Sequence, residues 1–162
     1  MTLYPLTNSK AIKHRSKLIA FIRRHGDRRI TQGAINWLQQ MSNQSLNTPG
    51  TKILAALDKN KLVGLLIVAQ YGIEESFMAV HKAYRNQNIA KAMLKQMISD
   101  LGKIYGRVAL DNISSLKACF SSGMVAFHLF QGPTNKPTLW LGGGDWKRSD
   151  VLAPQDNHIL VE

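Results

Sequence analysis

Apolar residues recur at two spacings along this chain, and the spacing separates predicted strands from predicted helices. Short apolar runs predict strands at residues 3–6, 52–57, 62–71, 75–81, 106–110, 124–130 and 138–141. Apolar residues at intervals of three and four predict helices from about residue 9 to 24, 31 to 41, 89 to 101 and 113 to 122. Strands before and after a central strand-helix-strand unit predict an α/β fold, with a mixed sheet and helices packed on it.

The stretch of residues 78–101, MAVHKAYRNQNIAKAMLKQMISDL, passes from an apolar strand through a polar loop into a helix. The helix is apolar along one side from Ile89 to Leu101, so that side is expected to be buried. The first N–H groups of a helix have no partner within it, and with the helix dipole they favour an anion such as a phosphate. Arg85 and Lys91 add positive charge at this point.

Composition narrows the class of protein. The 162 residues, 44% of them hydrophobic, suit one globular domain with a substantial core. A single cysteine, Cys119, excludes an intramolecular disulfide, and no zinc-binding spacing is present, so we expect a reducing compartment and no metal. The longest apolar run is too short to span a bilayer and no signal region opens the chain, so we expect a cytoplasmic protein without a membrane partner.

The formal net charge is +11, from 21 basic and 10 acidic residues. Such an excess attracts polyanions over a wide surface. Coenzyme A, nucleic acid, ribosomes and acidic peptides all meet that description, and net charge does not choose among them.

Two segments carry a resemblance to a known family. Residues 85–90, Arg-Asn-Gln-Asn-Ile-Ala, resemble the Arg/Gln-x-x-Gly-x-Gly/Ala segment of the GNAT N-acyltransferases, whose backbone amides bind the pyrophosphate of acetyl-coenzyme A. Asn88 replaces a glycine there, but asparagine tolerates the left-handed backbone conformation and can cap a helix. The family's later segment, Asn-x-x-Ala-x-x-x-Tyr-x-x-x-Gly-Phe, is matched in part by Asn112, Ser115, Leu116, Cys119, Gly123 and Met124.

The order of predicted elements is also that of the GNAT fold, over residues 3–142. The resemblance implies a mixed, mostly antiparallel sheet with helices on both faces and a splayed pair of parallel strands at its centre, residues 75–81 and 106–110. It implies one acyltransferase domain at residues 1–144. Residues 145–162 are then a C-terminal extension, either ordered or loose.

The function implied by the resemblance is N-acyl transfer, most simply N-acetyl transfer, from acetyl-coenzyme A or another acyl-coenzyme A to an amine acceptor by direct attack. Met78, Ala79 and Val80 would lie nearest the acyl group. The whole set of residues implied to hold the cofactor is Met78, Ala79, Val80, Arg85, Asn86, Gln87, Asn88, Ile89, Ala90, Lys91, Asn112 and Ser115.

Three residues are candidates for the general base. Glu74 matches the strand glutamate that some family members use, Glu75 is its neighbour, and His81 could act through a water molecule. Cys119 stands where many members have a tyrosine that protonates the leaving thiolate, and we expect it not to be essential.

Each of these residues also has a purely structural interpretation. Adjacent acids at the start of a strand are often solvated turn residues, and a histidine at a strand end is often structural. Asn112, between a strand and a helix, can be an ordinary cap, and Cys119 can be a small apolar core residue.

Two other functions are compatible with the sequence. The helix, glycine turn and helix at residues 10–41, with Arg23, Arg24, Arg28 and Arg29 beside the turn, could bind nucleic acid on an inactive acyltransferase scaffold. The departures at Asn88 and Cys119 could instead mark a silent coenzyme A sensor. The sequence does not identify the acceptor, which can be a small molecule or a protein. It also does not determine the length of the acyl chain or whether the protein forms a homodimer.

Overall fold

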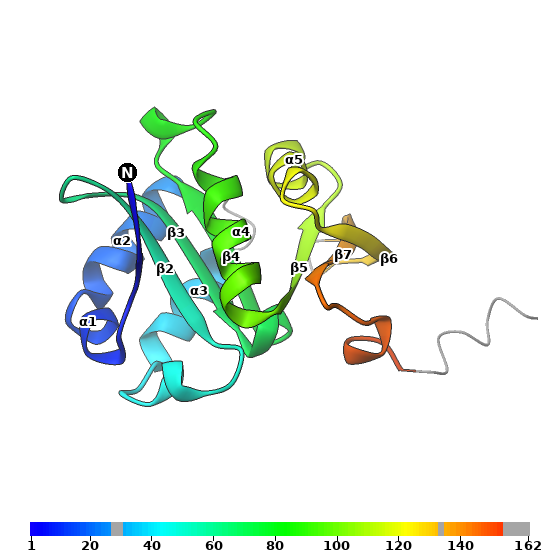
Figure 1. The fold of residues 1–162 in the computed structure, drawn as a ribbon, viewed down its shortest axis with the longest axis horizontal. Coiled ribbons are helices and arrows are strands. Elements are labelled where there is room, and N and C mark those ends of the chain that lie inside the picture. The colour runs from blue at the N-terminus through cyan, green and yellow to red at the C-terminus, as the bar shows by residue number, and fades with distance from the viewer. Residues whose placement is uncertain (27–30, 133–134, 154–162) are drawn as a thin grey trace, which may run out of the picture.

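The structure is a computed structural model, and it describes residues 1–26, 31–132 and 135–153. The strands form two separate sheets (Figure 1). In each sheet, neighbouring strands pair antiparallel, as expected of a mostly antiparallel fold. The first sheet has the order β1 (Thr2–Pro5), β2 (Lys52–Asp58), β3 (Lys61–Ala69), β4 (Glu75–Val80). The second has the order β5 (Lys103–Ala109), β7 (Pro137–Gly144), β6 (Val125–Gln131).

Helices cover both faces of the first sheet because β3 is apolar toward both. Successive side chains of a strand point to opposite faces, so Leu65 and Leu66 belong to different cores. Leu65 lies in the core that includes α1 (Asn8–Lys13), α2 (Arg15–His25) and α3 (Thr31–Gln40). Leu66 lies in the core that includes α4 (Ile89–Leu101) and α5 (Ile113–Ser121). The prediction of helices on both faces is confirmed.

Helix α4 has the predicted bounds and the predicted buried side. Met93 and Met97 are fully buried, and Gly102 ends the helix in the left-handed conformation, with φ of 83°. No helix in the described part of the chain is long and apolar enough to cross a membrane.

The predicted first helix is divided into α1 and α2 at His14, whose φ is −103°. Helical hydrogen bonds continue on both sides of the division, since the His14 N–H donates to Lys10 and the Leu18 N–H donates to His14. The amino-terminal cap of α1 is Thr7, whose hydroxyl accepts a hydrogen bond of 3.2 Å from the Lys10 N–H. Asn8, whose residue type also suits a cap, is the first helical residue, and its side chain instead accepts a bond of 2.8 Å from the Leu46 N–H.

The glycine-rich residues 142–144 were predicted to lie beyond the last strand, but they belong to β7. They continue the pairing of β7 with residues 103–105 of β5, and Trp146 packs so closely on Gly142 that a Cβ there would lie 2.5 Å from Cγ of its ring. Strand β5 likewise begins at Lys103, three residues before the predicted start.

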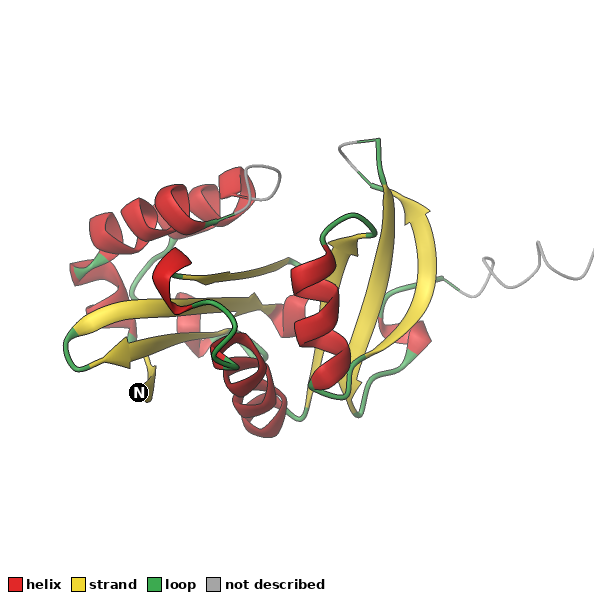
Figure 2. Ribbon diagram, turned by 90° about the horizontal axis from the view of Figure 1, so that it is seen from above, coloured by secondary structure: helices red, strands yellow, loops and turns green. Residues whose placement is uncertain are grey.

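The two sheets adjoin at β4 and β5, but within the described residues no ladder of hydrogen bonds joins these strands (Figure 2). The sequence predicts one sheet continuing past α4, and the structure divides that sheet in two. The chain crosses from one sheet to the other through α4. That β4 and β5 run parallel remains a prediction.

The described part of the C-terminal extension, residues 145–153, is ordered against the second sheet. Trp146 stacks on Phe127 with ring centroids 4.9 Å apart. Asp150 forms an ion pair of 2.9 Å with Lys103 and accepts a short hydrogen bond from the Tyr105 hydroxyl. Residues 154–162 of the predicted extension lie outside the described residues.

Tyr105 links β5 to this extension, and removing its hydroxyl group should lower the stability of the protein measurably. Its hydroxyl also accepts a bond of 2.8 Å from the Lys147 N–H. Burial and the bond to Asp150 raise the pKa of Tyr105 to about 12, so the hydroxyl keeps its proton. We expect Tyr105→Phe to lower the free energy of unfolding by about 1–3 kcal/mol, because two groups lose a partner.

Chemical denaturation would measure this change against Tyr4→Phe, which removes the hydroxyl of an exposed tyrosine and should change stability by less than about 0.5 kcal/mol. Equal stability of the two variants would contradict the assigned role of Tyr105.

Candidate functional site

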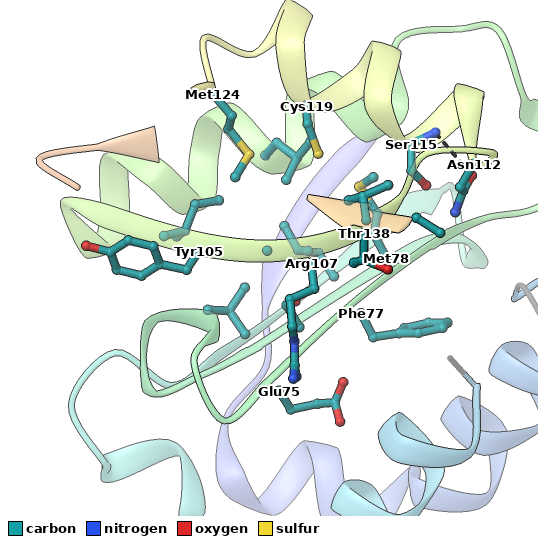
Figure 3. A pocket seen from close by; sticks show the side chains of 18 of the residues that line it. Glu75, Phe77, Met78, Tyr105, Arg107, Asn112, Ser115, Cys119, Met124 and Thr138 are labelled. Carbon is teal, nitrogen blue, oxygen red and sulfur yellow. Dashed lines mark hydrogen bonds between the residues drawn. The ribbon is translucent and has the colours of Figure 1, made fainter. Parts of the chain in front are cut away.

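Two cavities adjoin along the gap between the sheets. The first, of about 380 Å³, lies between β4 and β5 beside α5 (Figure 3). The second, of about 750 Å³, lies around the loop before α4 and the start of α5. Met78, Asn112 and Ser115 line both cavities, so the two spaces meet at these residues.

The loop before α4 places backbone in the left-handed region twice. Asn86 has φ of 64° and Asn88 has φ of 62°. The left-handed prediction for Asn88 is confirmed, while its side chain makes no cap bond to the helix. The first N–H groups of α4, from Ile89 onward, therefore have no partner from their own cap residue and border the second cavity.

Positive charge surrounds this second cavity. Lys82, Arg85, Lys91 and Lys117 line it, and none of its described lining residues is acidic. A cavity with four cationic side chains and a helix amino terminus suits a polyanion.

Arg85 and Gln87, which were both predicted to hold the cofactor, differ in their positions and contacts. The Arg85 guanidinium donates to the backbone carbonyl oxygens of Val80, at 3.3 Å, and His25, at 3.1 Å, so it ties the loop to α2. Gln87 lines neither cavity.

His81 lies outside both linings and performs a structural task. Its Nδ1 atom accepts a bond of 3.1 Å from the Ala83 N–H, which caps the short helix η3 (Lys82–Tyr84). Its ring packs on His25, with centroids 4.2 Å apart. Desolvation, with the charge of Lys61, lowers the pKa of His81. The structure thus separates this candidate base from the cavities.

His25 was missed in the sequence, where it is one more basic residue at a helix end. Its Nδ1 accepts a bond of 3.2 Å from the Lys82 N–H. Burial first, and then the charges of His81 and Arg24, lower the pKa of His25 to about 4, so it is neutral at neutral pH.

The two candidate glutamates are separated by the start of β4. Glu74 is exposed and lines neither cavity, whereas Glu75 lines the first cavity. Burial raises the pKa of Glu75, and the charge of Arg107 opposes the rise. Helix α3 can approach this carboxylate because it has Gly33 there, where a Cβ would lie 2.8 Å from Oε2 of Glu75.

Arg107 was also missed, although it is a charged residue inside a predicted strand. It lines the first cavity from β5, and Figure 3 shows its side chain extending toward Glu75. Its guanidinium carbon lies 5.1 Å from the centre of the Trp140 ring. Tyr105 lines the same cavity, but its hydroxyl is turned toward the C-terminal extension.

The α5 side of the first cavity is largely apolar. Cys119 is 5% exposed, and burial raises the pKa of its thiol to about 11, so the thiol is neutral at neutral pH. Asn112 caps α5 with a bond of 3.4 Å from the Ser115 N–H to Oδ1, and it also reaches both cavities. Asn112 is therefore a helix cap, and its contact with the cofactor stays a prediction.

Within the described ranges, no group of three or more His, Cys, Asp and Glu side chains could hold a metal ion. The two cavities are lined by Glu75 and Arg107, by the basic loop and by the apolar wall of α5.

Comparisons place this geometry in a family. The family model described as an acetyltransferase (GNAT) domain matches residues 27–119, which is more than half of the chain. No curated protein matches the chain.

Solved acetyltransferases share the fold. A ribosomal-protein-S5-alanine acetyltransferase from Vibrio fischeri superposes with a TM-score of 0.62 at 14% identity, covering 90% of this chain and 94% of that one. An aminoglycoside acetyltransferase in complex with coenzyme A and kanamycin gives 0.60 at 10% identity, covering 89% and 94%. A variant of the spermidine N-acetyltransferase from Vibrio cholerae gives 0.56 at 15% identity, covering 89% and 95%. The predicted fold class is confirmed.

The left-handed conformation of Asn88 can be tested by substitution. Asn88→Gly should keep the stability of the protein, because glycine adopts this conformation without steric cost. Asn88→Val should lower the free energy of unfolding by about 1–2 kcal/mol, because a branched side chain at positive φ is strained.

Thermal and chemical unfolding of the two variants measure the difference. The matched control is Gln87→Val, which places the same side chain at the neighbouring position, where φ is not positive. A loss of stability in Gln87→Val equal to that in Asn88→Val would contradict the conformational explanation.

Proposed function

Because this chain belongs to the GNAT acetyltransferase family, we propose that it transfers an acetyl group from acetyl-coenzyme A to an amine acceptor by direct attack. The observation that supports this most is the pair of adjoining cavities, which leads from a basic helix amino terminus to the half-buried carboxylate of Glu75. The basic cavity suits the phosphates, and the apolar cavity suits the thioester arm and the acceptor.

The residues around the second cavity fit coenzyme A. The backbone N–H groups of Ile89, Ala90 and Lys91, with the Lys82 and Lys117 ammonium groups, would hold its phosphates. Asn86 and Asn88 shape the loop, and Arg85 anchors it to α2.

Met78, Ala79 and Val80 of β4 line the second cavity together with Asn112 and Ser115, and Met78 also lines the first cavity. The second edge of β4 has no strand partner in the described part of the chain, so its N–H and C=O groups would pair with the amide groups of the arm. When bound, acetyl-coenzyme A supplies the activated acyl group.

Glu75 is the proposed general base. The amine nitrogen forms a bond to the acyl carbon, the carbon–sulfur bond breaks, Glu75 accepts the amine proton directly or through water, and the departing thiolate takes up a proton. A carboxylate whose pKa is raised by burial is a better proton acceptor near neutral pH than an ordinary one. Exposed Glu74 and the structural His81 have no part in this proposal.

The proposed reaction forms no acyl-enzyme. A thiol with a pKa of about 11 is almost wholly protonated at neutral pH, so Cys119 is a poor nucleophile. It remains a neutral thiol that packs against the arm.

No observation favours the two alternative functions. Helices α2 and α3 direct Phe21, Ile22 and Leu38 into the core beneath the first sheet, and the exposed side of α2 carries Arg23 and Arg24. Arg28 and Arg29, which the nucleic-acid hypothesis needs beside the turn, lie outside the described residues.

The role of Glu75 predicts a specific loss. Glu75→Gln should lower kcat/KM by about two to four powers of ten, because the variant lacks the proton acceptor. Coenzyme A affinity, measured by calorimetry, should stay within about threefold of the native value. Glu74→Gln is the matched control and should keep its activity.

The pH dependence follows from the raised pKa of Glu75. Only the ionised form accepts a proton, so activity should fall as the pH drops through a pKa that lies above the pKa of an ordinary glutamate.

For stability the sign is opposite: a carboxyl with a raised pKa stabilises the fold at low pH and loses this contribution as the pH rises through that pKa. Glu75→Gln should therefore unfold no more easily than the native protein at pH 7. Full activity in this variant, or equal losses in both glutamine variants, would refute the assignment.

Cys119→Ala should keep acyl transfer within about tenfold, or about 1.4 kcal/mol of activation free energy. A coenzyme A thiolate can take its proton from water, so loss of the thiol should matter less than loss of the base. Intact-protein mass spectrometry during turnover should show no acyl group on Cys119. Trapping that adduct, or losing several powers of ten in turnover with unchanged coenzyme A affinity, would overturn this view.

A further inference from the structure

The first cavity contains two opposite charges, and among the described residues the exposed one, Arg107, has no hydrogen-bond or ion-pair partner. Glu75 enters from β4 and Arg107 from β5. Within residues 1–26, 31–132 and 135–153, the Arg107 guanidinium makes no hydrogen bond and no ion pair, and its contact is the face of Trp140. Five N–H donors in a fixed planar arrangement are thus available to a ligand at the cavity.

The two charges are close without being joined. Arg107 is near enough to lower the pKa of Glu75, yet the two groups do not form an ion pair. A small group that carries both a positive and a negative charge could lie between them, with its cation toward Glu75 and its anion toward Arg107.

Aromatic rings continue from Arg107 across the second sheet. Arg107, Trp140 and His128 are directly opposite one another in the registers of β5, β7 and β6. The Phe130 ring lies 6.2 Å from that of Trp140 and 6.1 Å from that of His128, at interplanar angles of 29° and 12°. Phe130 also lines the first cavity, and all three rings are half-buried. The row therefore offers an apolar surface next to the charged pair.

We propose that the acceptor is an α-amino acid with an aromatic or other large apolar side chain. Its amine lies at Glu75, its carboxylate is bound by the Arg107 guanidinium, and its side chain lies on Trp140 and Phe130. This inference rests on the proposed transferase function and names the substrate class of the same site.

Other amines fit this arrangement less well. A polyamine would place a second cation beside Arg107, and the formal charge of +11 repels it further. A protein lysine or a peptide amino terminus has no carboxylate next to the reacting amine. The Arg107 side chain would then remain without its anion.

The test measures coenzyme A release with acetyl-coenzyme A and four acceptors. L-phenylalanine has the amine, carboxylate and ring. L-phenylalaninamide and phenethylamine lack the carboxylate, and L-alanine lacks the ring. We expect kcat/KM for phenylalanine to exceed that for each of the other three by about tenfold or more, since each lacks one paired group.

Variants of Arg107 test whether the preference for phenylalanine depends on this residue. Arg107→Gln should raise KM for phenylalanine about tenfold to a hundredfold and leave kcat/KM for phenethylamine within about threefold. Arg107→Lys should recover part of the loss, because it keeps the charge but not the paired donors. Lys95→Gln, which removes one exposed charge from α4 outside both cavities, should change nothing. Thermal unfolding of each variant checks that the fold is kept.

The outcomes distinguish a failure of the amino-acid inference from a failure of the proposed transferase function. If phenethylamine and the amide react as well as phenylalanine, or if Arg107→Gln weakens all acceptors equally, the amino-acid inference is wrong while the transferase function stands. A preference for phosphoethanolamine over phenylalanine would also overturn it. If no amine releases coenzyme A although coenzyme A binds, the proposed function and the inference both fail.

Discussion

The whole arrangement depends on β4 and β5 lying side by side without hydrogen bonding to each other. Within the described residues each strand has a strand neighbour on one side only, so the facing edges border the gap with backbone N–H and C=O groups that no strand ladder pairs. At one end the gap is closed, because Gly72 packs directly on the backbone of Tyr105, where any Cβ would collide with the carbonyl oxygen. Away from this contact, the two edges border the cavities. A gap of this kind is stable only if helices hold the sheets in place and a polar ligand can satisfy the edges.

Two sets of contacts hold the sheets in place. Leu94 of α4 and Cys119 of α5 belong to one apolar core with residues of both sheets, among them Leu66 and Leu141. The C-terminal extension then fixes the far side of β5 through Tyr105. Packing therefore holds the two sheets in place on either side of the gap.

Charge is distributed unevenly along this gap. The wide end has Lys82, Lys91 and Lys117 and no acidic lining residue, while the narrow end has Glu75 opposite Arg107. A long anionic ligand therefore has one favoured direction, with its phosphates at the helix amino terminus and its reactive end near the carboxylate. The same asymmetry explains why the net charge of +11 need not indicate nucleic acid.

The sequence predicts well what depends on neighbours along the chain. Helix α4 follows from its apolar spacing, and the left-handed Asn88 follows from a loop in which few other residues would do. Long-range contacts decide the rest. Which of Glu74 and Glu75 enters the cavity depends on how β4 packs against α3, and the availability of Arg107 depends on the register with Trp140.

The glycines of residues 142–144 show the same limit, since their place in β7 depends on pairing with residues 103–105 of β5, which lie far away along the chain. His25 and His81 looked like separate basic residues in the sequence and form a packed pair in the structure.

The most direct test of the account is a crystal structure of the protein with coenzyme A. The account predicts the phosphates at residues 88–91 and the arm between β4 and β5, passing Met78, Asn112 and Ser115, with its sulfur in the cavity lined by Glu75 and Cys119. Coenzyme A bound elsewhere on the surface, with the space between β4 and β5 filled by side chains, would contradict it.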